Sequence, residues 1–486
     1  MAAVPVTVAS PEPDESHLLI GEPAWGVARA SVLGRGERRF EAETYLSDGY
    51  GLRLAIESRA TGWVPLRELT NVWQPSRLKG VVAGSEDGAP FLAAGQVFET
   101  RPTARKWLSL SQTPDASERF VQPGTILVSC SGIVGRVALA HRPHIGRLIS
   151  HDLLRVDAAK ADLVGWLYAY LRTASFRLMA TGERYGHVIK HLEVAHLDAL
   201  PVVQINGAEE ARFNAEVNRI FSYRDRAYSL IDEAEELYRS GLGIDSSWLE
   251  QDLPFSVRSS GIANGRRRLD AFHYNLPSVD FRRACQNNAI RVQTLNELSV
   301  DIWWPGRFRR VFGANGTPYV SAEDLFNLNP VITKFVYSGL IENREDYFLE
   351  PEWLVMVRSG QVYGLNGSVR LVGQRLTRFL VSEDLIRISP RLDLIRHGYL
   401  LAALAHPTLG RPLVIRHAYG TSIPHLEPDD VATIEIPRLE SSVEEKIADR
   451  YEEASELQAS ADELEDQITT AAEQIVQAFM RGMSAV

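Results

Sequence analysis

Histidine and cysteine spacing offers few ways to build a catalytic centre in this chain. His187 and His191 are four residues apart, as two zinc ligands on a helix can be, but no further ligands are evident nearby. Cys130 and Cys285 are the two cysteines and lack metal-ligand spacing. We therefore expect no metal site. We interpret His191 as structural, because it precedes a Leu-Glu pair that recurs after His425.

Motifs that bind nucleotides or cofactors are also missing from the sequence. No Gly-rich loop ends in Gly-Lys-Ser or Gly-Lys-Thr, and there is no dinucleotide-binding fingerprint. No Asn/Asp-Pro-Pro-Tyr segment of the amino-methyltransferase kind occurs, and no carboxylate–lysine cluster suggests a nuclease. The chain is predicted to be non-catalytic and to carry no cofactor of its own.

The composition is that of an ordinary globular protein. The chain has 486 residues, of which 45% are hydrophobic and 23% are charged, enough for two or three cores. No apolar run approaches the ~20 residues of a membrane span, and residues 1–17 lack the features of a secretory signal. Two cysteines fit a reducing compartment. We expect a cytoplasmic protein with no membrane partner.

The acidic residues are concentrated in two segments. The net charge is −10, yet residues 442–481 hold eleven acids against three bases, and residues 209–239 hold eight against five. Without these segments the chain is close to neutral, at about +1. The remaining parts are therefore free to carry basic faces suited to nucleic acid.

The same two segments are predicted to be long helices. Neither contains Gly or Pro, and apolar residues recur in both at heptad-like spacing, in register after a shift of 234 residues. Each helix either packs on its own domain or pairs with the other, and we favour antiparallel pairing. Ser442 and Glu445 predict a capping box at the start of the second helix. The residues expected in the seam and at a partner-binding face are Phe213, Val217, Ile220, Leu230, Ile447, Tyr451, Leu464 and Ile468.

An internal repeat predicts the remaining organisation. The segment Gly124 to Gly132 matches Trp353 to Gly360, and several other landmarks recur at an offset of about 230 residues, including Trp73 with Trp304. Short apolar runs and helical spacing in each copy predict a mixed α/β fold. The expected domains are a flexible tail at 1–17, a first α/β domain at 18–205, a helix at 206–242, a second α/β domain at 243–438 and a helix at 439–482.

Two sets of residues carry a resemblance to a known family. The first is the segment 126–136, Ile-Leu-Val-Ser-Cys-Ser-Gly-Ile-Val-Gly-Arg, with Tyr185-Gly186. The second is the segment 355–360, Val-Met-Val-Arg-Ser-Gly, with Tyr419-Gly420. With the duplication and the helices, the chain resembles the specificity subunit of type I restriction–modification systems over nearly its whole length. The second copy departs from the first by extra residues in the turn at 362–370.

The resemblance implies a division of labour. Two tandem target-recognition domains, separated by the paired helices, would each read one half of a split double-stranded DNA target. Methyltransferase subunits would bind the chain and, through them, a restriction/translocase subunit. S-adenosylmethionine, Mg and ATP are expected only on those partners. Alternatives are a scaffold or specificity-like subunit of a different defence system, and a self-contained DNA-modifying enzyme, against which the missing cofactor motifs weigh.

Base readout needs basic or hydrogen-bonding side chains on exposed loops. Trp303 and Trp304 are more consistent with a core position than with a wedge against DNA. The candidates for DNA contact are Lys106, Arg136, Arg184, Tyr185, His187 and Lys190 in the first repeat, and Arg307, Arg309, Arg310, Tyr363, Arg370 and Thr421 in the second.

Overall fold

The chain forms two compact units that share both long helices. The computed structural model describes residues 45, 47–77, 79–113, 115–182, 191–244, 256–263, 268–269, 271–274, 281–282, 285 and 291–483, so the tail expected at 1–17 lies outside the described residues. Unit 1 comprises Met1–Ser222 and Ala461–Val486, and unit 2 comprises Tyr223–Ser460. Each unit therefore contains one half of each long helix.

Unit 1 contains two four-stranded sheets and a two-stranded ribbon. The sheets have the orders β2-β9-β6-β7 and β3-β5-β4-β8, and the ribbon pairs β1 with β10. Its elements up to the first long helix are α3 (Asp48–Glu57), β1 (Trp63–Pro65), β2 (Thr70–Trp73), β3 (Val82–Ala83), β4 (Ala89–Leu92), α4 (Ala94–Val97), β5 (Lys106–Leu108), β6 (Ile126–Ser129), β7 (Val137–Leu139), β8 (Leu148–Ile149), β9 (Leu153–Ala158), α5 (Val164–Arg172), α6 (Ala174–Gly182), α7 (Val194–Asp198) and β10 (Pro201–Val203).

Unit 2 repeats this order, which confirms the expected fold of two tandem mixed α/β units. Its sheet β12-β18-β15-β16 corresponds to β2-β9-β6-β7, and the parallel pair β13–β17 corresponds to β4–β8. Its elements are α9 (Ser259–Ala263), β11 (Val292–Thr294), α11 (Leu295–Leu298), β12 (Ser299–Trp303), β13 (Phe312–Val320), α12 (Ala322–Leu325), β14 (Phe335–Val336), β15 (Leu354–Val357), β16 (Val369–Leu371), β17 (Leu380–Val381), β18 (Leu385–Pro390), α13 (His397–Ala405), α14 (Arg411–Ile415), α15 (Pro428–Val431) and β19 (Glu435–Pro437).

Strand β15 is apolar at every position because both faces of its sheet are covered. In β15, Leu354 and Met356 belong to the core cluster that includes α13 and the long helices. The alternate residues Val355 and Val357 belong to a second cluster on the opposite face, with Val320 of β13 and Val381 of β17. Side chains alternate between faces along a strand, so burial of both faces removes the usual polar alternation.

The two long helices are α8 (Gly207–Leu242) and α16 (Ser441–Met480). Within unit 2 they run antiparallel: Leu439 lies beside Gly241 near the end of α8, and Arg450 bonds Glu233 earlier in α8. The antiparallel arrangement that we expected is confirmed there. No described helix combines the length and the apolar character needed to cross a membrane.

The start of α16 differs from the predicted capping box. The helix begins at Ser441, which places Ser442 inside it. The carboxylate of Glu444 instead accepts a hydrogen bond from the Leu439 backbone N–H at 2.8 Å and bonds Arg438 at 2.7 Å. Arg438, six residues before Glu444, holds Glu444 in this role, and a Ser-x-x-Glu pattern does not reveal that contact.

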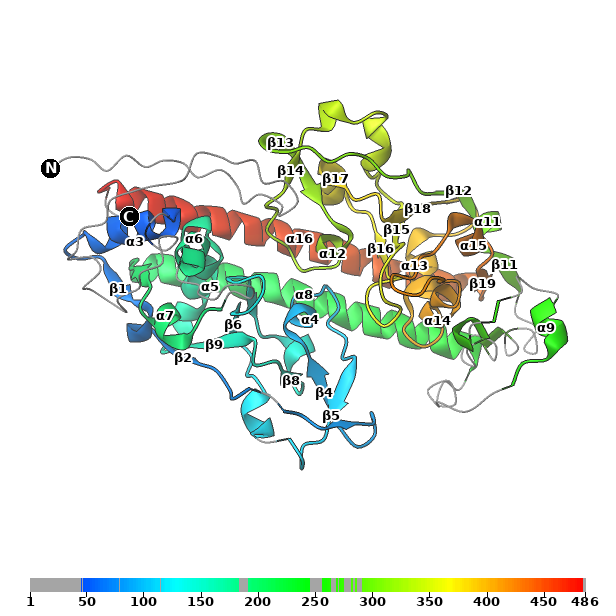
Figure 1. The fold of residues 1–486 in the computed structure, drawn as a ribbon, viewed down its shortest axis with the longest axis horizontal. Coiled ribbons are helices and arrows are strands. Elements are labelled where there is room, and N and C mark those ends of the chain that lie inside the picture. Colours follow the sequence, from blue (N-terminus) through cyan, green and yellow to red (C-terminus); the bar gives the residue numbers. More distant parts are fainter. Residues whose placement is uncertain are drawn as a thin grey trace. The chain divides into compact units, whose positions relative to one another are not determined.

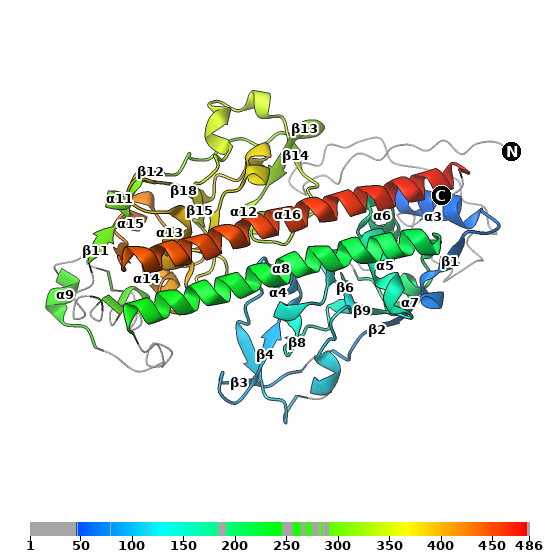
Figure 2. The same cartoon turned by 180° about the vertical axis from the view of Figure 1, so that it is seen from behind.

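A short helix in each unit packs closely on a long helix at a glycine. A Cβ on Gly165 of α5 would lie 2.3 Å from the Cα of Asn214 in α8. A Cβ on Gly398 of α13 would lie 2.5 Å from the carbonyl oxygen of Ala448 in α16. Figure 1 shows α5 beside α8 in unit 1, and Figure 2 shows α13 beside α16 in unit 2. Only glycine permits these backbone distances.

We predict that Gly165→Ala and Gly398→Ala each lower the free energy of unfolding by about 1–3 kcal/mol, because the added methyl group forces helix displacement. The control is Gly51→Ala in α3, where a Cβ meets nothing within 4 Å. It should raise the free energy by about 0.5–1 kcal/mol through helix propensity. Urea titration followed by circular dichroism measures all three. Equal stability of Gly165→Ala and Gly51→Ala would contradict the packing argument.

A buried histidine gives unit 1 a dependence on pH. His144 is fully buried, its Nδ1 accepts from the His141 backbone N–H at 3.3 Å, and its Nε2 lies 3.0 Å from the Val97 carbonyl oxygen. Nδ1 is thus an acceptor, and the ring is neutral. Burial is the largest cause that lowers the pKa of His144 to about 3, from an ordinary value of 6.5.

Below pH 6.5 the unfolded chain binds a proton at His144 that the folded chain does not bind. The free energy of unfolding should therefore fall by up to about 1.4 kcal/mol for each pH unit between 6.5 and 3. His144→Gln retains a donor and an acceptor but does not titrate. Its free energy of unfolding should therefore fall less steeply as the pH is lowered. Denaturant titrations from pH 7.5 to 4.5 compare the two proteins, and parallel pH profiles would rule out this role.

Candidate nucleic-acid interface

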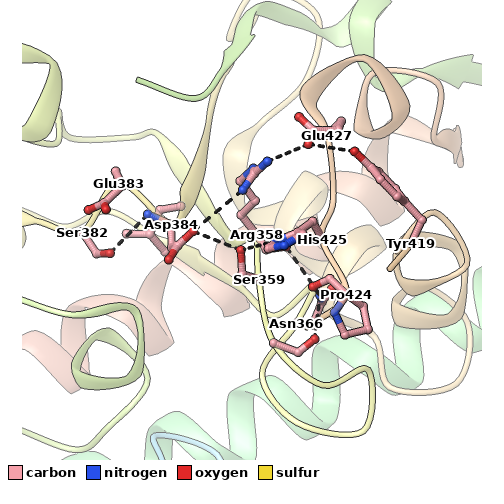
Figure 3. Close-up of polar contacts among 12 residues, drawn as sticks. Arg358, Ser359, Asn366, Ser382, Glu383, Asp384, Tyr419, Pro424, His425 and Glu427 are labelled. Carbon is pink, nitrogen blue, oxygen red and sulfur yellow. Dashed lines mark hydrogen bonds and ion pairs between the residues drawn. The ribbon is translucent and has the colours of Figure 1, made fainter. Parts of the chain in front are cut away.

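In unit 2, a serine after β15 ties together three segments. Ser359 Oγ donates to Asp384 Oδ1 at 3.0 Å and lies 2.7 Å from His425 Nδ1. His425 also pairs through its backbone with Tyr419, at 2.8 and 2.9 Å. Figure 3 shows these side chains converging from the end of β15, the start of β18 and the segment after α14. We call the contact between Ser359 and His425 the Ser–His latch.

The latch is not a catalytic triad, although it contains Ser, His and Asp. In a triad the carboxylate orients the imidazole, which takes the serine proton. Here the Ser359 hydroxyl donates its hydrogen bond to Asp384, so His425 Nδ1 must be the donor to Ser359 Oγ. The imidazole is therefore not placed to accept the serine proton. Among the residues that the structure describes, no group of three or more His, Cys, Asp or Glu side chains could hold a metal ion.

Arg358 neutralises the acids of this region. Its Nη2 donates to Glu427 Oε1 at 2.6 Å, and its Nη1 lies 3.8 Å from Asp384 Oδ1. The guanidinium carbon lies 4.0 Å from the ring centroid of Trp304. Tyr419 donates its hydroxyl to the same Glu427 oxygen at 3.1 Å. Arg358 is buried, so its role is to hold the loops rather than to meet a ligand.

A buried amide joins the two loops that end in exposed side chains. Asn366 Nδ2 donates to the carbonyl oxygens of Gly360 at 3.0 Å and Pro424 at 2.8 Å (Figure 3). These loops carry large exposed side chains: Tyr363 is 69% exposed, Ile423 57% and Tyr419 45%. The arrangement is a hydrogen-bonded base with exposed side chains on both loops.

Unit 1 repeats the latch with different neighbours. Ser131 Oγ lies 3.1 Å from His191 Nδ1, and the Leu192 backbone N–H donates to the Cys130 carbonyl oxygen at 2.9 Å. Gln74 Nε2 bonds Cys130 Sγ at 3.4 Å. These two residues take the positions that Trp304 and Arg358 occupy in unit 2. Burial raises the pKa of Cys130 to about 11, so its thiol stays protonated and unreactive at neutral pH.

The two first-repeat candidates that the structure describes lie on different sheets. Lys106 is exposed at the start of β5 in the sheet β3-β5-β4-β8. Arg136 is half-buried just before β7, with its guanidinium carbon 4.1 Å from the Phe98 ring centroid. Arg184, Tyr185, His187 and Lys190 lie outside the described residues.

Two of the basic candidates of unit 2 have partners inside the unit, and the other two lie on an exposed segment. Arg310 Nη2 donates to Glu383 at 2.6 Å and lies over Phe308 and Tyr319, while Arg370 is half-buried and donates to the Leu325 carbonyl oxygen. Both are engaged within the unit. Arg307 and Arg309 are exposed between β12 and β13.

The structure brings two other candidates together. Tyr363 and Thr421 are exposed on the two loops that Asn366 links. Tyr419 at the base of the second loop was not selected from the sequence, although its repeat counterpart Tyr185 was. Comparison of the two repeats would have identified it. Trp303 and Trp304 are half-buried, and Trp303 packs edge-to-face on Trp353 with 4.7 Å between ring centroids.

The predicted seam residues are mostly buried within the units. Phe213 packs on Trp166 of α5 at 5.0 Å, and Leu230, Ile447 and Tyr451 belong to the core cluster of unit 2. Leu230, Ile447 and Tyr451 share this cluster with residues of the other long helix and of α13. The remaining buried members of the predicted seam are Val217, Ile220 and Ile468.

The seam of α16 departs from prediction in its second half. Leu464 is half-buried, and the next residue, Glu465, is fully buried. Glu465 bonds Arg172 at 3.0 Å and accepts from the Tyr168 hydroxyl, both on α5. A buried ion pair with a hydrogen-bonded tyrosine offsets the cost of burying the carboxylate, and a hydrophobic pattern does not reveal such a position.

Comparison with known proteins gives structural likenesses only. No protein-family model matches the chain, and no curated protein matches it. The S subunit of a type I restriction-modification system from M. genitalium is similar over 87% of this chain and 95% of its own, with 14% identity and a TM-score of 0.30. The HsdS subunit from Thermoanaerobacter tengcongensis is similar over 86% and 96%, with 15% identity and a TM-score of 0.25.

A third similar chain comes from a structure described as showing complex assembly and conformational transition of the type I R-M system. It covers 87% of this chain and 98% of its own, with 14% identity and a TM-score of 0.26. TM-scores this low do not establish a common function.

Removal of the amide that links the loops should loosen them. We predict that Asn366→Ala lowers the free energy of unfolding by about 1–3 kcal/mol, because the Gly360 and Pro424 carbonyl oxygens lose the hydrogen bonds that this amide donates. Amide exchange should rise at Gly360, whose N–H donates to the Pro424 carbonyl oxygen at 3.1 Å. Hydrogen–deuterium exchange and urea titration measure both effects. Thr421→Ala, on the exposed part of the second loop, is the control and should change stability by less than about 0.5 kcal/mol. Unchanged exchange at Gly360 in Asn366→Ala would refute the linking role.

Proposed function

We propose that this chain is the DNA sequence-recognition subunit of a type I restriction–modification or related phage-defence complex. Each unit reads one half of a bipartite double-stranded DNA target. The chain supplies specificity, and methyltransferase subunits with a restriction/translocase subunit supply the chemistry. S-adenosylmethionine, Mg and ATP bind to those partners, and the complex works in the cytoplasm.

The observation that carries this proposal is the repetition of the same loop base in two units. Ser131 with His191 and Ser359 with His425 form the same contact at the end of corresponding strands. The loops attached to that base differ, since the unit 2 turn is longer and carries Tyr363. One fold used twice with different exposed loops fits two different half-sites.

A non-catalytic role agrees with the chemistry of the described residues. Asp384 contacts the serine of the latch instead of the histidine, so His425 is not oriented to act as the base for Ser359. The Cys130 and Cys285 thiols are buried and unpaired, and burial raises their pKa values to about 11 and 12. Free thiols also suit a reducing cytoplasm.

Methyltransferase recruitment is assigned to the exposed faces of the long helices. In unit 2 these faces are rich in acids, which would repel DNA phosphates but would suit a basic protein surface. Some of these acids already pair within the unit, as Glu233 does with Arg450 at 3.0 Å. The exposed acids of unit 2 on α8 and α16 are Asp232, Glu233, Glu236, Glu445, Asp449, Glu453 and Glu456.

The test is methylation mapping of the chain expressed with a type I methyltransferase subunit. A split motif is expected, with two short specified halves around an unspecified gap. The double variant Tyr363→Ala with Thr421→Ala should weaken recognition of one half by about 1–3 kcal/mol per lost base contact. The other half, read by unit 1, should not change.

The control is Leu392→Ala, an exposed side chain beyond the opposite end of β18 from Asp384. It should leave both halves unchanged. A continuous motif, or no sequence preference when the methyltransferase subunit is present, would overturn the proposal. Methylation by this chain without any partner would favour the self-contained enzyme instead.

A further inference from the structure

Each unit carries a pair of exposed basic residues after one edge strand of a four-stranded sheet, β2 in unit 1 and β12 in unit 2. In unit 1 these are Arg77 and Lys79, and in unit 2 they are Arg307 and Arg309. All four side chains are exposed, and none has a hydrogen bond or ion pair to a described residue. Each pair lies in a segment with no helix or strand.

Strand register shows that the two pairs are equivalent. Trp73 lies opposite Arg155 in the β2–β9 pairing, and Trp303 lies opposite Arg387 in the β12–β18 pairing. Both arginines are fully buried. Trp73 therefore corresponds to Trp303, and not to Trp304 as the sequence comparison suggested.

With this register, the two segments share a spacing of Trp, Pro and two bases. Trp73-Gln-Pro-Ser-Arg-Leu-Lys79 aligns with Trp303-Trp-Pro-Gly-Arg-Phe-Arg309 without a gap. The tryptophan, the proline and both positive charges coincide, while the intervening residues differ. The charges have thus been retained in two copies whose other side chains have diverged.

The segments that carry these charges contain no acid of their own. Neither residues 73–84 nor residues 303–320 contain an acid. The neighbouring Arg310 is neutralised by Glu383 at 2.6 Å, and Arg119 donates to the Ser76 carbonyl oxygen at 3.0 Å. Nearby arginines with a structural role therefore have partners inside the unit. The exposed pairs remain available to an external anion, although the chain as a whole is acidic.

We infer that Arg77 with Lys79, and Arg307 with Arg309, bind DNA phosphates, one pair for each half-site. This inference rests on the proposed function, because it takes duplex DNA as the ligand. Lys and Arg contacts to phosphate hold a protein on the duplex and fix its register, but they carry no sequence information. The two pairs are thus positioning residues, and the loops around the latch read the bases.

The experiment measures DNA affinity against salt concentration for the complex with its methyltransferase subunit. Fluorescence anisotropy is recorded on a duplex containing the mapped target and on a duplex of scrambled sequence. The variant changes all four residues to Gln. Each phosphate contact contributes about 0.9 to the slope of log affinity against log salt, so the slope should fall by up to about 3.6 on both duplexes. The mapped methylation motif should stay the same.

Controls come from the opposite end of the same two sheets, after the strands that pair with β2 and β12. Lys160 follows β9 and Arg391 follows β18, and both are exposed. Lys160→Gln with Arg391→Gln should leave the slope unchanged, apart from the general effect of net charge. The charge-preserving variant Arg77→Lys with Lys79→Arg should bind like the parent protein. Thermal unfolding of every variant is compared with that of the parent.

An unchanged salt slope in the four-residue variant would overturn this inference. An altered methylation motif would also overturn it, because the pairs would then read bases. If the slope falls by the same amount per removed charge in the control variant, net charge alone explains the effect and the inference is wrong. The proposed function fails separately, if the parent complex has no split motif. The salt slope on scrambled DNA still tests the basic pairs in that case.

Discussion

Each unit depends on a sheet that is buried on both faces. Alternate residues of β15 enter two different cores, one shared with the long helices and one shared with the smaller sheet. Apolar burial contributes roughly 25 cal/mol for each Å² removed from water, so both cores favour the same strand positions. The loops at the ends of these strands are consequently anchored on a structure with little freedom to shift.

The long helices complete these cores. The first half of α8 packs on α5 at Gly165, and the first half of α16 packs on α13 at Gly398. The second half of each helix belongs to the other unit, where Glu465 bonds Arg172 and Tyr238 packs edge-to-face on Tyr399. Neither unit has a complete core without part of both helices. This explains why the helices are long, amphipathic and free of glycine over most of their length.

Polar residues then decide where the anchored loops lie. Arg155 and Arg387 are fully buried in corresponding strands and donate to backbone carbonyl groups of the preceding turn. Burial lowers the pKa of each to about 10, which leaves both charged at neutral pH. Asn366 satisfies two further backbone carbonyl groups between two loops, and the Ser–His latch of unit 2 joins two side chains beside them. Because these contacts use backbone and buried atoms, exposed residues such as Tyr363 can vary without loss of the fold.

Much of the organisation is determined by the sequence alone, because local patterns carry it. The repeat predicted two similar α/β units, and heptad-like spacing without Gly or Pro predicted two long helices, observed as α8 and α16. The concentration of acids on those helices could likewise be counted from the sequence. Of the four basic candidates in unit 2, Arg307 and Arg309 lie on an exposed segment as expected.

Only the tertiary structure decided which polar groups meet. Glu383 neutralises Arg310 across 73 residues, and the Leu325 carbonyl oxygen accepts from Arg370 across 45, so neither arginine is a free cation. Arg172 makes Glu465 the buried residue of α16 in place of its apolar neighbour Leu464. Strand register showed that Trp73 and Trp303 are the corresponding residues of the two repeats. Each outcome depends on a partner distant in the chain, and hydrophobic periodicity, which reports only the neighbours along one element, contains no information about that partner.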